Sequence, residues 1–242
     1  MSAPGPSAQA SNHAEVGRDA PAYFDRADGV QPALAIVDYG MGNRRSVEKA
    51  FVHVGAPAQV SADHDVLRRA DGLVLPGVGA FPRAMANLRE LGLDELLRER
   101  VSQGTPLLGI CLGMQLGFQR SSERGGAEGL GLVAGEVVRL PDMGLKLPQI
   151  GWNEVCLQRP SPLTTGLPPR CAFYHVHSYA PRPADERDVV GLTDYGAPLV
   201  TVVSHGAFFG VQFHPEKSSR HGLRVLANFA RMCAGRRTGA RP

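Results

Sequence analysis

The chain has 242 residues, of which 43% are hydrophobic and 20% are charged, and its formal net charge is +3. This length suits one large α/β domain, and the small charge, carried by scattered basic residues, argues against a nucleic-acid partner. No apolar run approaches the roughly 20 residues that span a bilayer, so we expect no membrane partner and a cytoplasmic location. The four cysteines are irregularly spaced, which predicts free thiols, and a free thiol can act as a nucleophile.

The two ends of the chain differ in composition from its centre. Residues 1–31 are rich in Ala, Ser, Pro, Gly and Asp and have no apolar period, which predicts a disordered tail. Acidic residues in this segment argue against a transit peptide. A folded domain is predicted over residues 32–235, and residues 236–242 are predicted to form a frayed C-terminal tail.

Strand and helix patterns alternate in the first half of the predicted domain. The apolar runs LAIVD, AQV, GLVLPG and PLLGIC are each followed by a helical pattern: RRSVEKAFVHVG, DHDVLRRA, residues 83–101 and LGMQLGFQR, respectively. This alternation predicts an α/β fold, with a mostly parallel central sheet and helices on both faces. After about residue 131, short β segments, among them AFYHVHSYA, predict an antiparallel extension, and residues 222–235 predict a closing amphipathic helix.

Cys111 lies in the sequence GICLG, between a predicted strand and a predicted helix. The small residues Gly109 and Gly113 permit a tight turn that exposes the sulfur at the carboxyl end of the sheet. The helix N-terminus favours a thiolate, and the backbone N–H of Leu112 is placed to receive an oxyanion. Cys111 is also compatible with a small apolar residue that ends a buried strand, so the assignment depends on a partner base.

His214 supplies that base in the sequence FHPE. A histidine can take the proton of a cysteine nucleophile and later give a proton to the leaving amine. Glu216 can accept the other ring N–H, which fixes the tautomer and favours the imidazolium. The alternative base, His205, falls in a predicted hairpin turn and lacks a nearby carboxylate in the sequence, so His214 is favoured.

The loop LPGVGAF, residues 75–81, follows the third predicted strand. In a parallel sheet this loop lies at the same carboxyl edge as Cys111. Its glycines permit close backbone approach, so the N–H of Val78 or Gly79 is predicted to complete an oxyanion hole with that of Leu112. Taken alone, PGVG is also compatible with an ordinary turn.

A second cluster of polar and sulfur side chains follows residue 155. Cys156, Cys171, His175 and His177 include metal-ligand types, with both histidines on one face of a predicted strand. Their spacing fits no standard zinc pattern. We therefore expect no metal site.

Seven motifs fall in order over residues 34–230: IVDYGMGN, LPGVGAF, GICLGMQL, EGLGL, PQIGWN, FYHVHSY and GVQFHPEKS. They resemble those of class I glutamine amidotransferases, and DYGMGN, PGVGAF, IGWN and HSY resemble more specifically the glutaminase subunit of imidazole glycerol phosphate synthase from histidine biosynthesis. The resemblance implies the flavodoxin-like class I fold and hydrolysis of L-glutamine to glutamate and ammonia through a cysteinyl thioester, without a cofactor. It also implies a heterodimer with a separate cyclase subunit, which makes imidazole glycerol phosphate and aminoimidazole carboxamide ribotide.

The resemblance also assigns roles to individual residues. It implies that Cys111 attacks the glutamine amide, that His214 moves the proton and that Glu216 orients His214. The residues implied to bind the substrate are Gln115, Glu123, Ser178 and Tyr179. Those implied to face the cyclase at the mouth of an ammonia passage are Tyr39, Asn43, Trp152, Asn153, Tyr174 and Lys217. Without the resemblance, Trp152 would be equally compatible with a core aromatic and Lys217 with a solvated charge.

Two residues depart from the family pattern. Arg44 stands where an apolar residue is more usual, and His175 replaces an aromatic or apolar residue; both changes bear on the partner surface rather than on the triad. Two other functions are compatible with the motifs: a glutaminase for anthranilate or aminodeoxychorismate synthase, and an inactive subunit that only binds a cyclase. IGWN and DYGMGN argue against the first, and the intact Cys, His and Glu argue against the second.

Overall fold

The computed structural model describes residues 31–237, so the predicted tails at residues 1–31 and 236–242 lie almost entirely outside the described residues. The strands of a nine-stranded sheet are β1 (Leu34–Val37), β2 (Ala58–Ser61), β3 (Gly72–Gly77), β4 (Leu107–Cys111), β8 (Gln149–Leu157), β9 (Arg170–His177), β11 (Val189–Asp194), β12 (Pro198–His205) and β13 (Phe208–Val211). A four-stranded sheet contains β5 (Phe118–Ser121), β6 (Ala127–Glu128), β7 (Val133–Arg139) and β10 (Tyr179–Pro183). The helices are α1 (Arg44–His53), α2 (His64–Arg69), α3 (Phe81–Glu90), α4 (Leu93–Ser102), α5 (Leu112–Leu116) and α6 (Ser219–Arg237), and the short 3-10 turns are η1 (Glu123–Gly125), η2 (Pro162–Thr164), η3 (Glu186–Asp188) and η4 (Pro215–Lys217).

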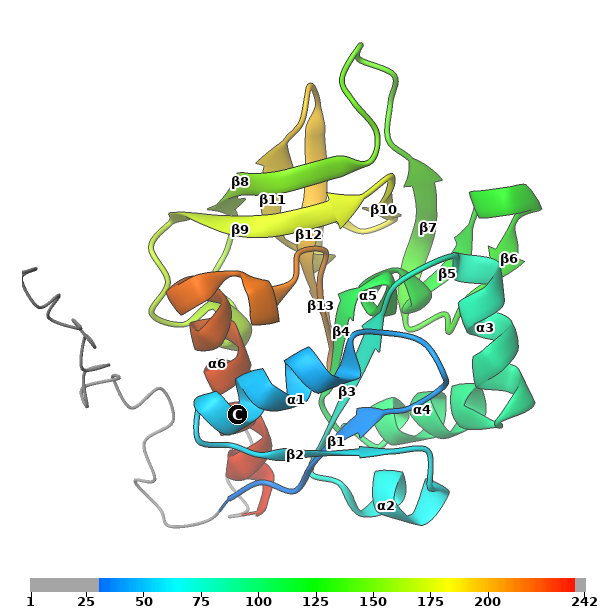
Figure 1. Ribbon diagram of the computed structural model, residues 1–242, viewed down its shortest axis with the longest axis vertical. Coiled ribbons are helices and arrows are strands. Elements are labelled where there is room, and N and C mark those ends of the chain that lie inside the picture. The colour runs from blue at the N-terminus through cyan, green and yellow to red at the C-terminus, as the bar shows by residue number, and fades with distance from the viewer. Residues whose placement is uncertain (1–30, 238–242) are drawn as a thin grey trace, which may run out of the picture.

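The larger sheet has a parallel half and an antiparallel half. Its strand order is β2-β1-β3-β4-β13-β12-β11-β8-β9. The first five strands pair in parallel, and from β13 onward each neighbour is antiparallel. Figure 1 shows β8 and β9 lying across the upper end of the parallel strands. The predicted parallel centre with an antiparallel extension is therefore confirmed.

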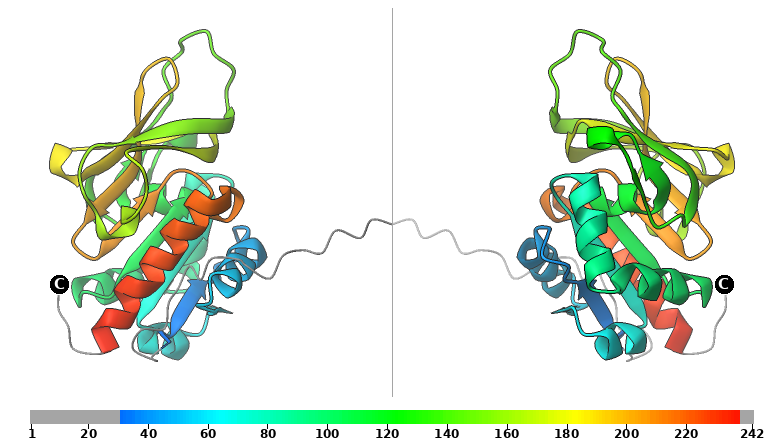
Figure 2. Two further views of the ribbon diagram at one scale, coloured as in Figure 1. Left: turned by 90° about the vertical axis from the view of Figure 1, so that its left-hand side faces the viewer. Right: turned by 90° about the vertical axis from the view of Figure 1, so that its right-hand side faces the viewer.

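Helices cover both faces of the parallel half, as predicted. On one face α1 and α6 pack together, with the rings of Phe51 and Phe229 in an edge contact at 6.5 Å between centroids. On the other face α2 to α5 bury a separate apolar cluster that includes Phe81 and Leu96. Figure 2 shows these two layers from opposite sides. None of the helices within residues 31–237 combines the length and apolar character needed to cross a bilayer.

Three predicted elements are divided in the structure. The helix predicted over residues 83–101 is two helices, α3 and α4, because Gly92 between them adopts a left-handed φ of +64°. The helix predicted over LGMQLGFQR ends at Leu116, where the chain pairs with residues 129–133 instead: the Leu116 carbonyl accepts from the N–H of Leu130 at 2.8 Å. The single strand predicted for AFYHVHSYA divides at Ser178 into β9 and β10, which belong to different sheets.

The turn from β4 into α5 requires small residues. A Cβ on Gly113 would lie 1.7 Å from the Leu75 carbonyl oxygen, and one on Gly109 would lie 2.6 Å from the Gly113 oxygen. This close approach packs α5 directly on β3, and Cys111, at the junction of β4 and α5, adopts a φ of +54°. Such a conformation of a non-glycine residue costs on the order of 1–3 kcal/mol and persists only where the surroundings enforce it.

Two buried histidines, His175 and His177, lie on the same face of β9; because His175 is 0% exposed, the expectation that its side chain bears on the partner surface is wrong. Nδ1 of His175 donates to the Phe173 carbonyl at 3.1 Å, and Nδ1 of His177 donates to the Tyr179 carbonyl at 2.9 Å. Burial lowers the pKa of His175 to about 3 and that of His177 to about 4, with repulsion between the two rings adding to the shift at His175. Both rings are therefore neutral in the folded protein near neutral pH.

We expect Gly113→Ala to lower the free energy of unfolding by about 2–3 kcal/mol, because the new methyl group overlaps the backbone of β3. Urea unfolding measures this loss. The matched control is Gly235→Ala in α6, where a Cβ meets no heavy atom within 4 Å. Alanine there should leave stability unchanged or raise it by up to about 1 kcal/mol. Equal effects at the two positions would contradict the account of the turn.

The free energy of unfolding should fall as the pH drops below about 6.5, the ordinary histidine pKa. Below that pH the unfolded chain binds protons at His175 and His177, whereas in the folded protein both rings stay neutral. Each ring contributes up to about 1.4 kcal/mol per pH unit until the folded pKa is reached. In His175→Phe the loss between pH 6.5 and 4.5 should be smaller by about 2–3 kcal/mol, as measured by urea unfolding at both pH values. An unchanged loss would mean that His175 is not held neutral.

Candidate active site

A cavity of about 340 Å³ opens where the carboxyl ends of β3, β4 and β9 meet. Parallel strands bring the segments that follow them to this edge, so residues far apart in the sequence come together. Cys111 and His214 both line the cavity, although about a hundred residues separate them. The cavity is therefore the candidate active site.

Cys111 lies at the end of β4 and is almost completely buried, with 6% of its surface exposed. Its sulfur has two polar neighbours besides His214. It lies 3.8 Å from the Val176 carbonyl oxygen, to which a thiol can donate, and 3.7 Å from Nε2 of Gln212, which donates to the sulfur. Leu112, the first residue of α5, also lines the cavity, at a helix end whose N–H groups have no intrahelical acceptor.

His214 is held on three sides. Its Nδ1 lies 3.0 Å from Oε1 of Glu216, whose side chain is 1% exposed. Its backbone N–H donates to the Tyr174 carbonyl at 2.9 Å, and its carbonyl accepts from the Ser218 hydroxyl at 2.6 Å. The ring can therefore turn little between Glu216 and Cys111.

The electrostatic balance at His214 favours a charged ring. Burial disfavours the imidazolium, but hydrogen bonds to Cys111 and Glu216, together with the negative charges of these groups, outweigh it and raise the pKa of His214 to about 10. The ring is therefore an imidazolium near neutral pH. The site stabilises a charge pair between the ring and the buried Glu216 carboxylate.

His205 does lie in a hairpin turn, between β12 and β13, as predicted. The expectation that it lacks a nearby carboxylate is wrong, because η3 brings Asp188 alongside β12 and its Oδ1 lies 2.9 Å from Nδ1 of His205. The pair lies away from the cavity, however, and the His205 side chain is 55% exposed. His205 therefore cannot serve Cys111.

The loop after β3 forms one wall of the cavity through Val78 and Gly79. Gly79 has a φ of +101°, which places its backbone in a conformation that other residues avoid. Tyr39 supports this loop from inside: its hydroxyl donates to the Pro76 carbonyl at 2.9 Å. Burial raises the pKa of Tyr39 above its usual value, and only 1% of the residue is exposed. The predicted placement of the Tyr39 side chain at a partner surface is therefore wrong.

The four residues expected to bind substrate all line the cavity with Cys111. Nε2 of Gln115 donates to the Tyr179 carbonyl and to Oε1 of Gln212, each at 3.0 Å. Oε2 of Glu123 accepts from the Phe81 N–H at 2.8 Å, at the N-terminus of α3. Ser178 and Tyr179 line the opposite wall, where β9 turns into β10.

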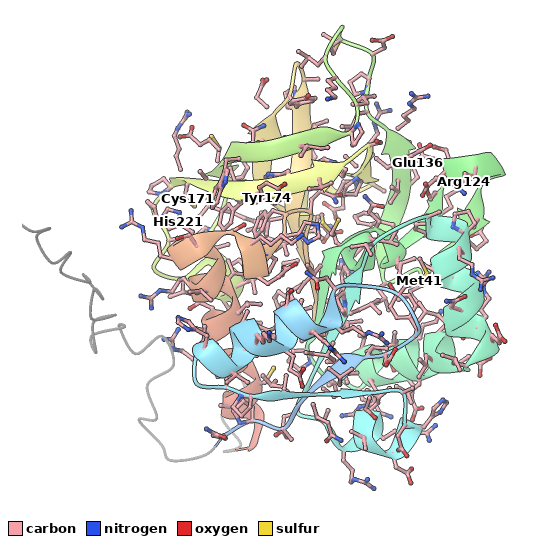
Figure 3. All side chains as sticks on the ribbon, viewed as in Figure 1. Met41, Arg124, Glu136, Cys171, Tyr174 and His221 are labelled. Atoms are coloured by element: carbon pink, nitrogen blue, oxygen red, sulfur yellow. The ribbon has the colours of Figure 1, made fainter. Side chains whose placement is uncertain are left out.

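Two aromatic side chains, Trp152 and Tyr174, and the adjacent Lys217 lie beside the cavity mouth; we call this group the aromatic cluster. Trp152 is 56% exposed, so it is not a core residue, and its ring meets the edge of Tyr174 at 6.2 Å between centroids. Nζ of Lys217 lies 6.0 Å from the centre of the Tyr174 ring. Figure 3 shows Tyr174 on β9, above the segment that carries Lys217. A half-exposed tryptophan in contact with a tyrosine is typical of a surface that binds another protein, because Trp and Tyr are enriched at such interfaces.

Asn43, Asn153 and Arg44 complete the surface expected to face a partner. Asn43 is half-buried at the start of α1. Nδ2 of Asn153 donates to the Asp194 carbonyl at 2.7 Å and so ties β8 to the end of β11. Arg44, which departs from the family pattern, forms an ion pair with Asp38 in the loop after β1.

Gln212 is a polar residue of the site that sequence reasoning missed. It is 0% exposed and lies between Cys111 and Gln115. One signal was present: Gln212 is a polar residue within the apolar run FFGVQF. Within residues 31–237, no group of three or more His, Cys, Asp or Glu side chains is arranged to hold a metal ion.

Comparisons with known proteins agree with this geometry. Residues 35–233 match the family model described as glutamine amidotransferase class-I. The chain is 51% identical over 199 residues to imidazole glycerol phosphate synthase subunit HisH of Moorella thermoacetica, covering 82% of this chain and 94% of that protein. It is 53% identical over 199 residues to the protein of the same name from Symbiobacterium thermophilum, covering 82% and 93%.

A solved structure shares the fold at lower identity. It is a putative GMP synthase subunit from Thermoplasma acidophilum, 20% identical, with a TM-score of 0.65 over 86% of this chain and 97% of that one. At this identity the likeness concerns the fold alone. The sequence matches reach further: the chain belongs to the class I glutamine amidotransferases and, within them, to the family of imidazole glycerol phosphate synthase subunit HisH.

Proposed function

We propose that this chain is the glutaminase subunit of imidazole glycerol phosphate synthase and that Cys111, His214 and Glu216 form its catalytic triad. One observation carries the proposal: the buried His214 ring, backed by the buried Glu216 carboxylate at 3.0 Å, lines the same cavity as Cys111. Such an arrangement, with an adjacent base that a third group orients, activates a cysteine nucleophile. The match to the glutamine amidotransferase family model supports L-glutamine as the substrate, and the HisH relatives support a role in imidazole glycerol phosphate synthesis.

The reaction proceeds by two acyl transfers. The Cys111 thiolate attacks the side-chain amide carbon of glutamine, and the resulting oxyanion accepts hydrogen bonds from Leu112 N–H and from the N–H of Val78 or Gly79. The His214 imidazolium gives its proton to the leaving nitrogen, and ammonia departs as the thioester forms. Water then attacks the thioester, with neutral His214 taking its proton, and glutamate leaves as the thiolate returns.

The cavity wall supplies groups for the amino-acid end of glutamine. The carboxylate of Glu123 provides the negative charge that an α-ammonium group requires, while its bond to Phe81 N–H fixes its position. Gln115 keeps an amide oxygen as an acceptor, since its hydrogen bonds to Tyr179 and Gln212 are both donated. Ser178 and Tyr179 add backbone groups on the opposite wall.

The partner in this proposal is a separate cyclase subunit, bound as a heterodimer over the cavity mouth. The aromatic cluster of Trp152, Tyr174 and Lys217 would meet it, with Asn43 and Asn153 beside the cluster. Ile150, which is 57% exposed on β8, adds apolar surface next to Trp152. A partner seated here shields the ammonia from water between the site of its release and the site of its use.

Cys111→Ala tests the proposal in the assembled complex. Because no thioester can form, glutamine-dependent synthesis of imidazole glycerol phosphate should fall by about 10⁴-fold or more. Ammonium salt at mildly alkaline pH should restore synthesis, because the cyclase chemistry belongs to the partner. Product formation with each nitrogen source is the measurement.

Cys156→Ala, at a half-buried cysteine on β8 away from the cavity, is the matched control and should keep glutamine-dependent activity. If Cys111→Ala retained turnover with glutamine, Cys111 would not be the nucleophile. If the variant complex made no product with ammonia while the wild type did, the loss of activity would be structural. The proposal that this chain only hydrolyses glutamine and that the partner carries out the cyclisation would then be wrong.

A further inference from the structure

Gln212 is a fully buried amide in the wall behind the candidate nucleophile. It follows β13 and precedes Phe213 and His214, and its backbone N–H donates to the Thr201 carbonyl at 2.8 Å. Burying an amide is costly unless its polar atoms find partners. Gln212 finds them in Gln115 and Cys111.

The direction of each hydrogen bond in this chain is determined by a backbone carbonyl. The Tyr179 carbonyl can only accept, so the NH₂ end of Gln115 must face it. The same NH₂ group donates to Gln212 at 3.0 Å, which requires an oxygen at that end of the Gln212 amide. The NH₂ group of Gln212 is then turned toward the Cys111 sulfur, at 3.7 Å.

The two polar neighbours of the sulfur, apart from His214, favour opposite protonation states. The Val176 carbonyl, at 3.8 Å, accepts from a thiol and repels a thiolate. The Gln212 N–H interacts more strongly with a thiolate, because a hydrogen bond to an ionised acceptor is about twice as strong as a neutral one. Gln212 therefore supplies a fixed donor that acts on the reactive, ionised form.

We propose that Gln212 is a positioning residue whose N–H holds the Cys111 thiolate, with Gln115 and Tyr179 fixing the direction of that N–H. The inference rests on the proposed role of Cys111 as nucleophile. It also links the substrate wall to the sulfur, because Gln115, expected to contact glutamine, is the group that orients Gln212. Loss of the N–H should lower kcat, whereas loss of the contact with Gln115 should raise KM.

Two substitutions separate these effects. Gln212→Glu keeps an oxygen for Gln115 and replaces the N–H with a negative oxygen beside the sulfur. Gln212→Met keeps the approximate shape and removes both hydrogen bonds. Gln59→Met, at an exposed residue of β2, is the matched control.

The test is the rate of Cys111 alkylation by iodoacetamide as a function of pH, followed by peptide mass spectrometry on the full chain. Iodoacetamide lacks the amino-acid end of glutamine, so its rate reports the sulfur and not the substrate wall. We expect both Gln212 variants to react about tenfold more slowly at pH 7 and their rate curves to shift upward by about one pH unit. In the assembled complex kcat should fall about tenfold in both variants, and KM for glutamine should rise more in Gln212→Met.

An alkylation curve like that of the wild type in both variants would overturn the inference, even if melting temperature or KM changed, because Gln212 would then be structural. If Gln212→Met does not fold, Gln212→Glu decides by the same criterion. If the proposed function itself were wrong, the alkylation experiment would give another result: wild-type Cys111 would react no faster than Cys156, Cys171 and Cys233. Fast wild-type labelling with slow labelling of the variants supports both proposals.

Discussion

The contact between Gly113 and the Leu75 carbonyl determines the geometry of the whole site. At this point α5 packs on the backbone of β3 with no room for a side chain. The chain must therefore leave β4 through a tight turn, and Cys111 takes the positive φ that the turn demands. The same packing places the first N–H groups of α5 opposite the loop after β3, so one constraint sets the positions of the candidate nucleophile and of the expected oxyanion donors.

Burial strengthens the electrostatic attraction between the charged groups of the site. His214 and Glu216 are both nearly inaccessible, and in such surroundings their attraction is stronger than it is in water. The pKa of His214 rises because its acidic neighbours outweigh the cost of burying the charge. The histidines on β9 show the opposite outcome: His175 and His177 are buried without acidic partners, and their pKa values fall. The difference between the outcomes is the presence of Glu216 and Cys111.

Much of the architecture, and the motifs that carry the expected triad, could be predicted because periodicity and turn chemistry are local. The predictions were wrong where contacts between distant parts of the chain determine the end of a strand or the position of a side chain. β9 ends at His177 because the chain beyond Ser178 joins another sheet. Tyr39 was misplaced because its direction depends on the loop that it supports, and Asp188 was missed because η3 brings it to His205 from 17 residues away. Gln212 was missed because its polar contacts are with residues about a hundred positions earlier in the chain.

The central claim is that Cys111 is the nucleophile for glutamine. The most direct measurement is peptide mapping by mass spectrometry after treatment with a glutamine-analogue electrophile such as 6-diazo-5-oxonorleucine. The account predicts one adduct per chain, on Cys111, whose formation is slowed by excess glutamine and abolished in Cys111→Ala. An adduct on Cys156, Cys171 or Cys233 instead, or labelling that glutamine does not slow, would contradict the account.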